Sequence, residues 1–158
     1  MAAIGPRLLR TWDRLSRLPG GRRMFARLLG RMVPYSGTIR PFVHELEPGR
    51  AVVSIVERRG LRNHFRSVHA IALANLGELA SGLAMTLALP DGVRGIPIRV
   101  EVDYLKKARG RIVAEGRATP PEVVAADTDA SATAELRDAL GDVVATVVVR
   151  WRLSPEPL

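Results

Sequence analysis

Glu78 is the residue of this chain best placed to do chemistry, because it is the only acid in a long apolar segment. Residues 62–82 read RNHFRSVHAIALANLGELASG, so Asn63, His64 and His69 precede a run rich in alanine and leucine that holds Glu78 in its middle. A carboxylate in apolar surroundings is poorly hydrated, which raises its pKa and suits it to general-base or nucleophilic work. The segment therefore predicts either an exposed acid on a helix or an acid kept for chemistry.

The segment around Glu78 is predicted to form a helix from about His69 to Leu89, which Pro90-Asp91-Gly92 would end. A buried core helix explains this apolar run better than a membrane span does. The first N–H groups of a helix have no partner within it and lie at its positive end, so they can stabilise a developing oxyanion. Asn63 and His69 can orient a water or a carbonyl, although His69 or Ser67 could also serve only to cap the helix.

The composition indicates one ordinary globular domain and excludes several kinds of site. The chain has 158 residues, of which 47% are hydrophobic and 25% charged. It has no cysteine, which excludes a disulfide, a thiol nucleophile and a thiolate metal site. Its three histidines show no metal-binding spacing, and no glycine-rich phosphate loop is present, so no metal site is predicted.

The net charge of +8 is concentrated at the N-terminus. Residues 1–31 hold eight arginines against one acid, Asp13, and the rest of the chain is close to neutral. No nucleic-acid-binding motif accompanies the charge, so nucleic acid is not an expected partner.

Residues 1–32 read as a basic amphipathic helical lead, broken at Pro19-Gly20-Gly21. We favour packing on the protein's own domain or on a partner subunit over peripheral membrane contact through residues 1–31. Arginines interrupt every apolar stretch that could form a secretory signal, and we expect a cytoplasmic protein.

From residue 37 the pattern changes to the period of two that is typical of strands. Strands are predicted over residues 38–47, 50–57, 96–107, 110–119, 131–137 and 143–153, the last two joined by a hairpin turn at residues 139–142. Two strands, one long helix and about four more strands indicate an α+β fold, in which a largely antiparallel sheet wraps around a helix that is apolar on most sides. The predicted organisation is a lead at 1–32, a domain at 33–153 and a tail at 154–158.

The order of elements and residues 62–82 together resemble the hotdog-fold thioesterase superfamily over residues 33–153. This superfamily includes the phenylacetyl-CoA and 4-hydroxybenzoyl-CoA thioesterases, and the chain looks nearest to a poorly characterised branch of thioesterase-like domains. The phenylacetyl-type signature is an Asn, then a His six residues later followed by two glycines, then an acid nine residues after the His. Asn63, His69 and Glu78 have these spacings, and DYLKKARG at 103–110 resembles the strand that follows the helix. The two glycines are replaced here by Ala70 and Ile71, which keep the backbone N–H but narrow the approach to it.

This resemblance implies an acyl-CoA or acyl-carrier-protein thioesterase, in which Glu78 acts as base or nucleophile with the help of Asn63 and His69. The N–H groups of Ala70 and Ile71 would form the oxyanion hole. No cofactor is implied beyond the coenzyme A thioester as substrate, and the assembly is a homodimer or a dimer of dimers. Ser67, Lys106, Lys107 and Arg109 are candidates for substrate or coenzyme A binding, and simple solvated charges are the alternative for the three basic residues.

The helix itself adds a geometric argument for two subunits. Ala70 and Glu78 are eight residues apart, which is about 12 Å at 1.5 Å per residue. One thioester carbon cannot touch both groups, so if both act on it they must come from two chains.

Two alternatives to hydrolysis stay open. His64 lies fourteen residues before Glu78, the His-to-Glu spacing of hydroxyacyl-thioester dehydratases of the same fold, but the Pro-Gly pairs of their loop are missing here. The other alternative is a non-catalytic module that binds acyl thioesters.

Overall fold

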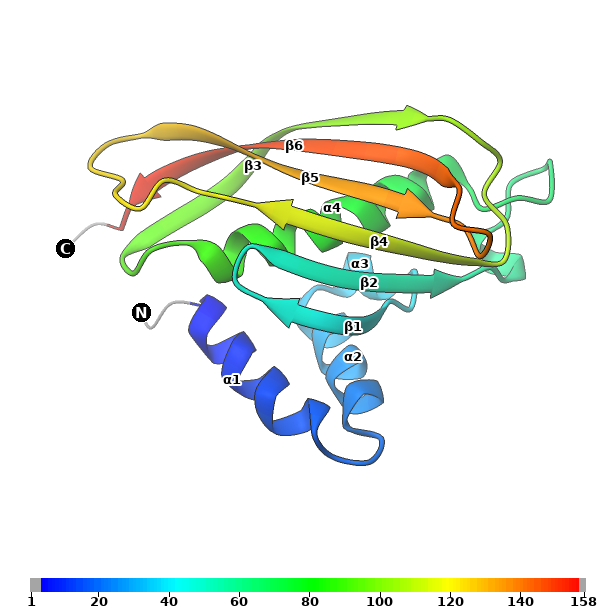
Figure 1. The fold of residues 1–158 in the computed structure, drawn as a ribbon, viewed down its shortest axis with the longest axis horizontal. Helices are drawn as coiled ribbons and strands as arrows, with labels where there is room; N and C mark the ends of the chain where they lie inside the picture. The colour runs from blue at the N-terminus through cyan, green and yellow to red at the C-terminus, as the bar shows by residue number, and fades with distance from the viewer. Residues whose placement is uncertain (1–3, 157–158) are drawn as a thin grey trace.

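A six-stranded antiparallel sheet curves around one long helix in the computed structural model, which describes residues 4–156 (Figure 1). The elements in chain order are α1 (Ile4–Ser16), α2 (Gly21–Met32), α3 (Pro34–Gly37), β1 (Phe42–Glu47), β2 (Arg50–Val56), the 3-10 turn η1 (Arg59–Leu61), α4 (Ala70–Ala88), β3 (Val93–Tyr104), β4 (Arg111–Ala118), β5 (Thr128–Arg137) and β6 (Val143–Pro155). This arrangement confirms the predicted α+β hotdog fold with a helical lead.

The strands lie in the order β1-β2-β4-β5-β6-β3, and every neighbouring pair is antiparallel. The predicted hairpin between β5 and β6 is present, and Gly141 at its turn has a φ of 87°, a left-handed conformation that glycine adopts without strain. Because β3 lies beyond β6 at the far edge, the chain must cross the end of the sheet to reach β4. Residues 105–110 make this crossing, and the Val68 N–H donates to the Ala108 carbonyl at 2.8 Å, just before α4 begins.

Helix α4 lies directly against the sheet because glycines stand at the points of closest approach. A methyl group on Gly77 would come within 2.3 Å of Val147 Cγ2, and one on Gly116 would come within 2.2 Å of the Ala80 backbone. The helix has the length and hydropathy of a membrane span, but most of it is buried inside the protein, as predicted for a core helix.

The helical lead packs on its own domain. Trp12 of α1 meets Phe25 of α2 edge to face, with ring centroids 5.1 Å apart, and both side chains are buried. Helix α1 contacts α4, and α2 contacts β1, so the lead covers the β1 side of the sheet (Figure 1). The apolar stripe of the lead is thereby used within the chain, in agreement with the interpretation favoured from the sequence.

Several strand boundaries differ from those predicted. Strand β3 spans Val93–Tyr104 instead of residues 96–107, and β5 begins at Thr128 instead of residue 131. Strand β1 begins at Phe42 instead of residue 38, because α3 and a turn with Arg40 at a φ of 54° occupy the preceding residues. Strand β6 continues through Pro155 instead of ending at residue 153, because β3 starts at Val93, earlier than predicted, and pairs with the extension.

Candidate functional site

The loop before α4 is folded around the side chain of Asn63. Its Oδ1 accepts hydrogen bonds from the Phe65 N–H at 3.0 Å, the Ser67 N–H at 3.2 Å and the Ser67 hydroxyl at 3.1 Å. Its Nδ2 makes no hydrogen bond to any part of residues 4–156. Asn63 therefore fixes the loop with one end and keeps two N–H donors at the other.

A cavity of about 330 Å³ lies between this loop, the start of α4 and the crossing segment 105–108. Five of the site residues predicted from the sequence line it together: Asn63, Ser67, Ala70, Lys106 and Lys107. Tyr104 at the end of β3 lines it as well, and its hydroxyl donates to the Ala70 carbonyl at 3.0 Å.

The two backbone N–H groups predicted as oxyanion donors differ in their hydrogen bonding. His69 is the N-cap of α4, and its Nδ1 accepts from the Ile71 N–H at 3.1 Å. The Ala70 N–H has no acceptor among the described residues. His69 and Ile71 line a different cavity, of about 210 Å³, together with Asn75. The free donor at the helix start is therefore the N–H of Ala70, next to Asn63.

Glu78 is half-buried in the third turn of α4, and its carboxylate makes no hydrogen bond or ion pair within residues 4–156. Burial raises its pKa above the ordinary value of 4.5, because the charged form loses hydration without gaining a partner. A methyl group on Gly82 would lie 3.6 Å from Glu78 Oε1 and 3.5 Å from Trp151 Cζ2, so the carboxylate and the indole both lie beside Gly82. Trp151 Nε1 is buried and also lacks a hydrogen-bond partner in the described chain.

Glu78 lines neither cavity at the helix start. It does share a helix face with Ala70, because Ala70, Ala74, Glu78 and Gly82 follow one another at intervals of four residues. This face runs beside β3 and β6, since Tyr104 contacts Ala70 and Trp151 lies beside Gly82. The structure thus brings the loop and the helix start together, and places Glu78 about 12 Å further along the same face.

The predicted basic residues differ in how far their charges are free. Lys106 pairs with Asp138 at 3.0 Å and with Asp142, and these hydrogen bonds raise its pKa. Lys107 lies over the Phe65 ring, 5.4 Å from the centroid, and Arg109 is exposed without an ion pair in the described chain. Lys106 is therefore the member of this group whose charge is already compensated.

His64, the histidine of the dehydratase alternative, is exposed and lies against Phe65, with ring centroids 3.8 Å apart. It lines neither cavity at the helix start.

Tyr104 and Trp151 were not singled out from the sequence, although the chain has only two tyrosines and two tryptophans. Tyr104 lies opposite the buried Ala145, whereas Trp151 is itself buried in β6, so a period-two pattern runs through both positions.

Comparison with known proteins bears on the fold and the family of this chain. A model of a family described as a domain of unknown function (DUF4442) matches residues 21–153. The structural genomics protein APC5556 is 29% identical, with a TM-score of 0.80 over 94% of this chain and 97% of its own. A Pseudomonas aeruginosa protein of unknown function, described as a probable thioesterase, is 25% identical, with a TM-score of 0.73 over 88% of this chain and 97% of its own.

A more distant structure, smu.793 from Streptococcus mutans bound to acetyl-CoA, is 17% identical, with a TM-score of 0.62 over 73% of this chain and 90% of its own. A search of curated proteins found no match. These neighbours share the hotdog fold with this chain, and the Pseudomonas aeruginosa protein among them is the one described as a probable thioesterase. Because the family model matches most of this chain, the chain belongs to the DUF4442 family.

Proposed function

We propose that the protein hydrolyses an acyl-CoA or acyl-carrier-protein thioester, with Glu78 as general base or nucleophile. One observation carries the proposal. A single helix holds a desolvated carboxylate and, at its start, a backbone N–H, neither of which has a hydrogen-bond partner within residues 4–156, in a fold shared with thioesterase-family proteins. These are the two groups that thioester hydrolysis requires, a base and an oxyanion donor.

The two groups would meet across a dimer formed by β3. Of the two edges of the sheet, β1 is covered by the helical lead, whereas β3 has no neighbour on its outer side within residues 4–156. Ile96, Ile98 and Val100 of β3 are 59%, 46% and 45% exposed. A long edge strand with exposed aliphatic side chains favours pairing with another strand, and a second copy of β3 is self-complementary in a two-fold dimer.

Antiparallel pairing of β3 with its copy would also place the two α4 helices antiparallel. The helix face that follows the β3 edge carries Ala70, Ala74, Glu78 and Gly82. Three of these four residues are small, which allows close approach of a second helix. With the two-fold axis near Ala74, the start of one helix would lie beside Glu78 of the partner subunit.

The proposed reaction then divides between the subunits. The Ala70 N–H and Asn63 Nδ2 bind the thioester oxygen, and Glu78 of the partner subunit removes a proton from a water that attacks the carbonyl carbon. The tetrahedral intermediate collapses by breaking the C–S bond, and the proton passes from Glu78 to the thiolate. The products are the carboxylic acid and the free thiol. Direct attack by the carboxylate, giving an anhydride that water opens, is the alternative step at the same residue.

Hydrolysis is tested by incubating the purified protein with a panel of acyl-CoA substrates and a thiol reagent. Wild type should release thiol from at least one substrate faster than Glu78→Ala does. Equal release by the two proteins across the panel would exclude hydrolysis of those substrates.

The shared site is tested with heterodimers purified through two different tags. Ala70→Pro removes the backbone N–H at the first helical position, where proline is tolerated. An Ala70→Pro chain paired with a Glu78→Gln chain should have one intact site, and so about half the wild-type activity per dimer. A chain carrying both substitutions, paired with wild type, should have none. The reverse result would mean that each site is built within one subunit.

A further inference from the structure

A groove lined by six arginines runs along α2 and onto the outer face of the sheet, outside the site described above. It consists of two adjoining cavities of about 370 and 830 Å³ that share Arg23, Arg40 and Phe42. The arginines that line it are Arg23, Arg27, Arg31, Arg40, Arg58 and Arg111. No aspartate or glutamate lines either cavity. We call this feature the arginine groove.

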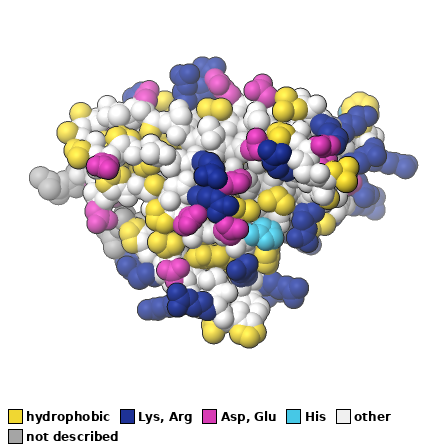
Figure 2. Space-filling view, viewed as in Figure 1, with side chains coloured by type: hydrophobic (Ala, Val, Ile, Leu, Met, Phe, Trp, Pro, Cys, Tyr) yellow, Lys and Arg dark blue, Asp and Glu magenta, His cyan; other side chains and the backbone are white. Residues whose placement is uncertain are grey.

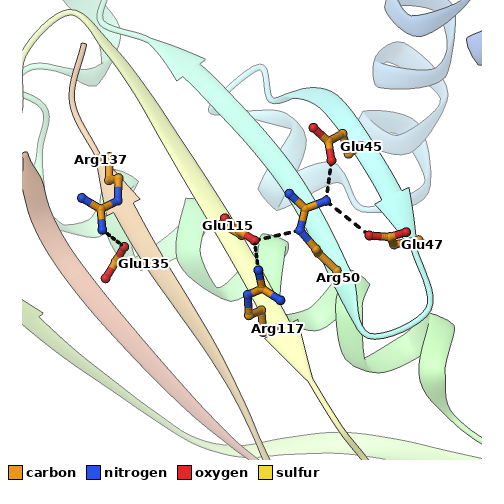
Figure 3. A network of polar contacts seen from close by, with 7 residues as sticks. All are labelled: Glu45, Glu47, Arg50, Glu115, Arg117, Glu135 and Arg137. Carbon is orange, nitrogen blue, oxygen red and sulfur yellow. Dashed lines mark hydrogen bonds and ion pairs between the residues drawn. The ribbon is translucent and has the colours of Figure 1, made fainter. Parts of the chain in front are cut away.

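The charges of the arginine groove are not compensated within the chain. None of its six arginines forms an ion pair within residues 4–156. Elsewhere on the outer face, arginines are paired: Arg50 contacts Glu45, Glu47 and Glu115, and Arg117 also contacts Glu115 (Figure 3). Figure 2 shows Lys and Arg side chains gathered at the right of this face, where β2 ends and β4 begins.

Part of this positive charge also acts on His44, beside the groove. It lies on β1 and bonds Ser54 of the groove at 2.7 Å. Its pKa is lowered first by burial and then by the charges of Arg111 and Arg22. A positive potential that is strong enough to affect a neighbouring residue indicates a surface suited to an anion.

Arg58 lines the smaller cavity of the groove and is held in place there. Its terminal nitrogen donates to the Thr38 carbonyl at 2.5 Å, which holds the guanidinium in place, while its Nε is buried and has no partner among residues 4–156. A guanidinium that lines a cavity can bind a phosphate oxygen through a charge-assisted hydrogen bond. Guanidinium groups match the geometry of phosphate oxygens particularly well.

We propose that the arginine groove binds the phosphate groups of the nucleotide end of a coenzyme A thioester, an assignment that rests on the proposed function. Two further features favour a nucleotide over a bare ion. Ile39, Phe42 and Val56 give the smaller cavity an apolar wall against which a base can stack. Thr38 and Ile39 also line the cavity that holds His69 and Ile71, so the groove continues toward the start of α4.

Binding is tested by calorimetric titration of the full chain with adenosine 3′,5′-bisphosphate and, separately, with inorganic phosphate. Arg58→Gln and Arg111→Gln should each raise the Kd of the bisphosphate by about ten-fold or more, as expected when one charge-assisted hydrogen bond is lost. Arg111 is exposed at the start of β4, so its variant should fold even if Arg58→Gln does not. Arg117→Gln is the matched control, since it removes the same charge from the same face of the same strand and should leave the Kd unchanged.

The source of the phosphate is tested by kinetics. Arg111→Gln should raise the KM for an acyl-CoA and leave the KM for the acyl-3′-dephospho-CoA nearly unchanged. If the groove binds the phosphate compounds but Arg111→Gln changes the two KM values equally, the coenzyme A assignment is overturned and the groove is a site for a free phosphate ligand. No binding, an equal effect of Arg117→Gln, or binding of anionic vesicles alone would overturn the phosphate site. Because the titrations need no turnover, an inactive protein that still binds would refute the proposed function but not the groove.

Discussion

The substitution Glu78→Gln should separate activity from stability. Glutamine keeps the shape of the side chain but cannot accept a proton at neutral pH or form an anhydride. A positioned general base contributes about 10²–10⁴-fold to a rate, so the variant should lose about 3–5 kcal/mol of transition-state stabilisation. The loss should fall on kcat rather than KM, because the carboxylate acts on the attacking water and not on the bound thioester.

The effect on folding should have the opposite sign. Glu78 has no partner within residues 4–156, and burial raises its pKa above 4.5. A pKa that is higher in the folded state means that the folded protein favours the protonated acid, so ionisation at neutral pH opposes folding. The stability that Glu78 contributes is fully present below pH 4.5 and is lost as the pH rises through the raised pKa. Because glutamine does not ionise, Glu78→Gln should be at least as stable as wild type at pH 7, and the difference should vanish below pH 4.5.

Both effects are measured on the same preparations, by thiol release from an acyl-CoA and by urea unfolding between pH 4 and pH 8. Glu122→Gln is the control, because Glu122 is exposed in the segment between β4 and β5. The kcat/KM of wild type should rise with pH along an acid limb whose midpoint lies above 4.5, and this limb should be absent from any residual activity of Glu78→Gln. Full activity in Glu78→Gln, or a variant destabilised at pH 7, would refute the reasoning.

Substitutions at three other positions test the helix start and its packing on the sheet. Ala70→Pro should lower kcat by about 10²–10³-fold, as expected for the loss of one oxyanion-hole donor. Ala70→Ser keeps the N–H and should leave kcat nearly unchanged, and steady-state kinetics of both variants measures the difference. His69→Ala should cost about 0.5–2 kcal/mol of unfolding free energy through the lost helix cap, and a kcat loss beyond ten-fold would show a role in chemistry. Gly116→Ala should destabilise the protein by about 3 kcal/mol or more in urea, because the new methyl overlaps the α4 backbone.

The fold could be predicted largely because its patterns are local. The period-two strands, the hairpin glycine at position 141 and the apolar α4 each leave a signal within a few residues. What could not be predicted depends on pairing between distant segments. The extension of β6 to Pro155 exists only because β3 begins at Val93 and lies beside it, and no local pattern reports that partner.

The residues of the candidate site could be proposed from the sequence, but their hydrogen bonds could not. The spacing of Asn63, His69 and Glu78 marked the segment, but sequence alone could not tell that His69 takes the Ile71 N–H while the Ala70 N–H stays free. Trp151 beside Glu78 was missed because it is more than seventy residues away in the chain, and only the curvature of the sheet brings them together. The arginine groove was missed for the same reason, since its residues come from α2, the following turn, β2 and β4.

Ala70 and Ile71, which replace the two glycines after His69, narrow the approach to the free N–H less than the sequence alone suggests. Ile71, whose side chain is 55% exposed, lines the cavity of His69 and Asn75, whereas Ala70 lines the cavity of Asn63. The bulky substitution therefore lies outside the cavity in which the free N–H is found, and only the methyl group of Ala70 borders that cavity. One methyl group narrows the approach to the Ala70 N–H without removing this donor. A helix start without glycine can therefore still donate a hydrogen bond to the oxygen of a thioester, as the proposed reaction with Glu78 requires.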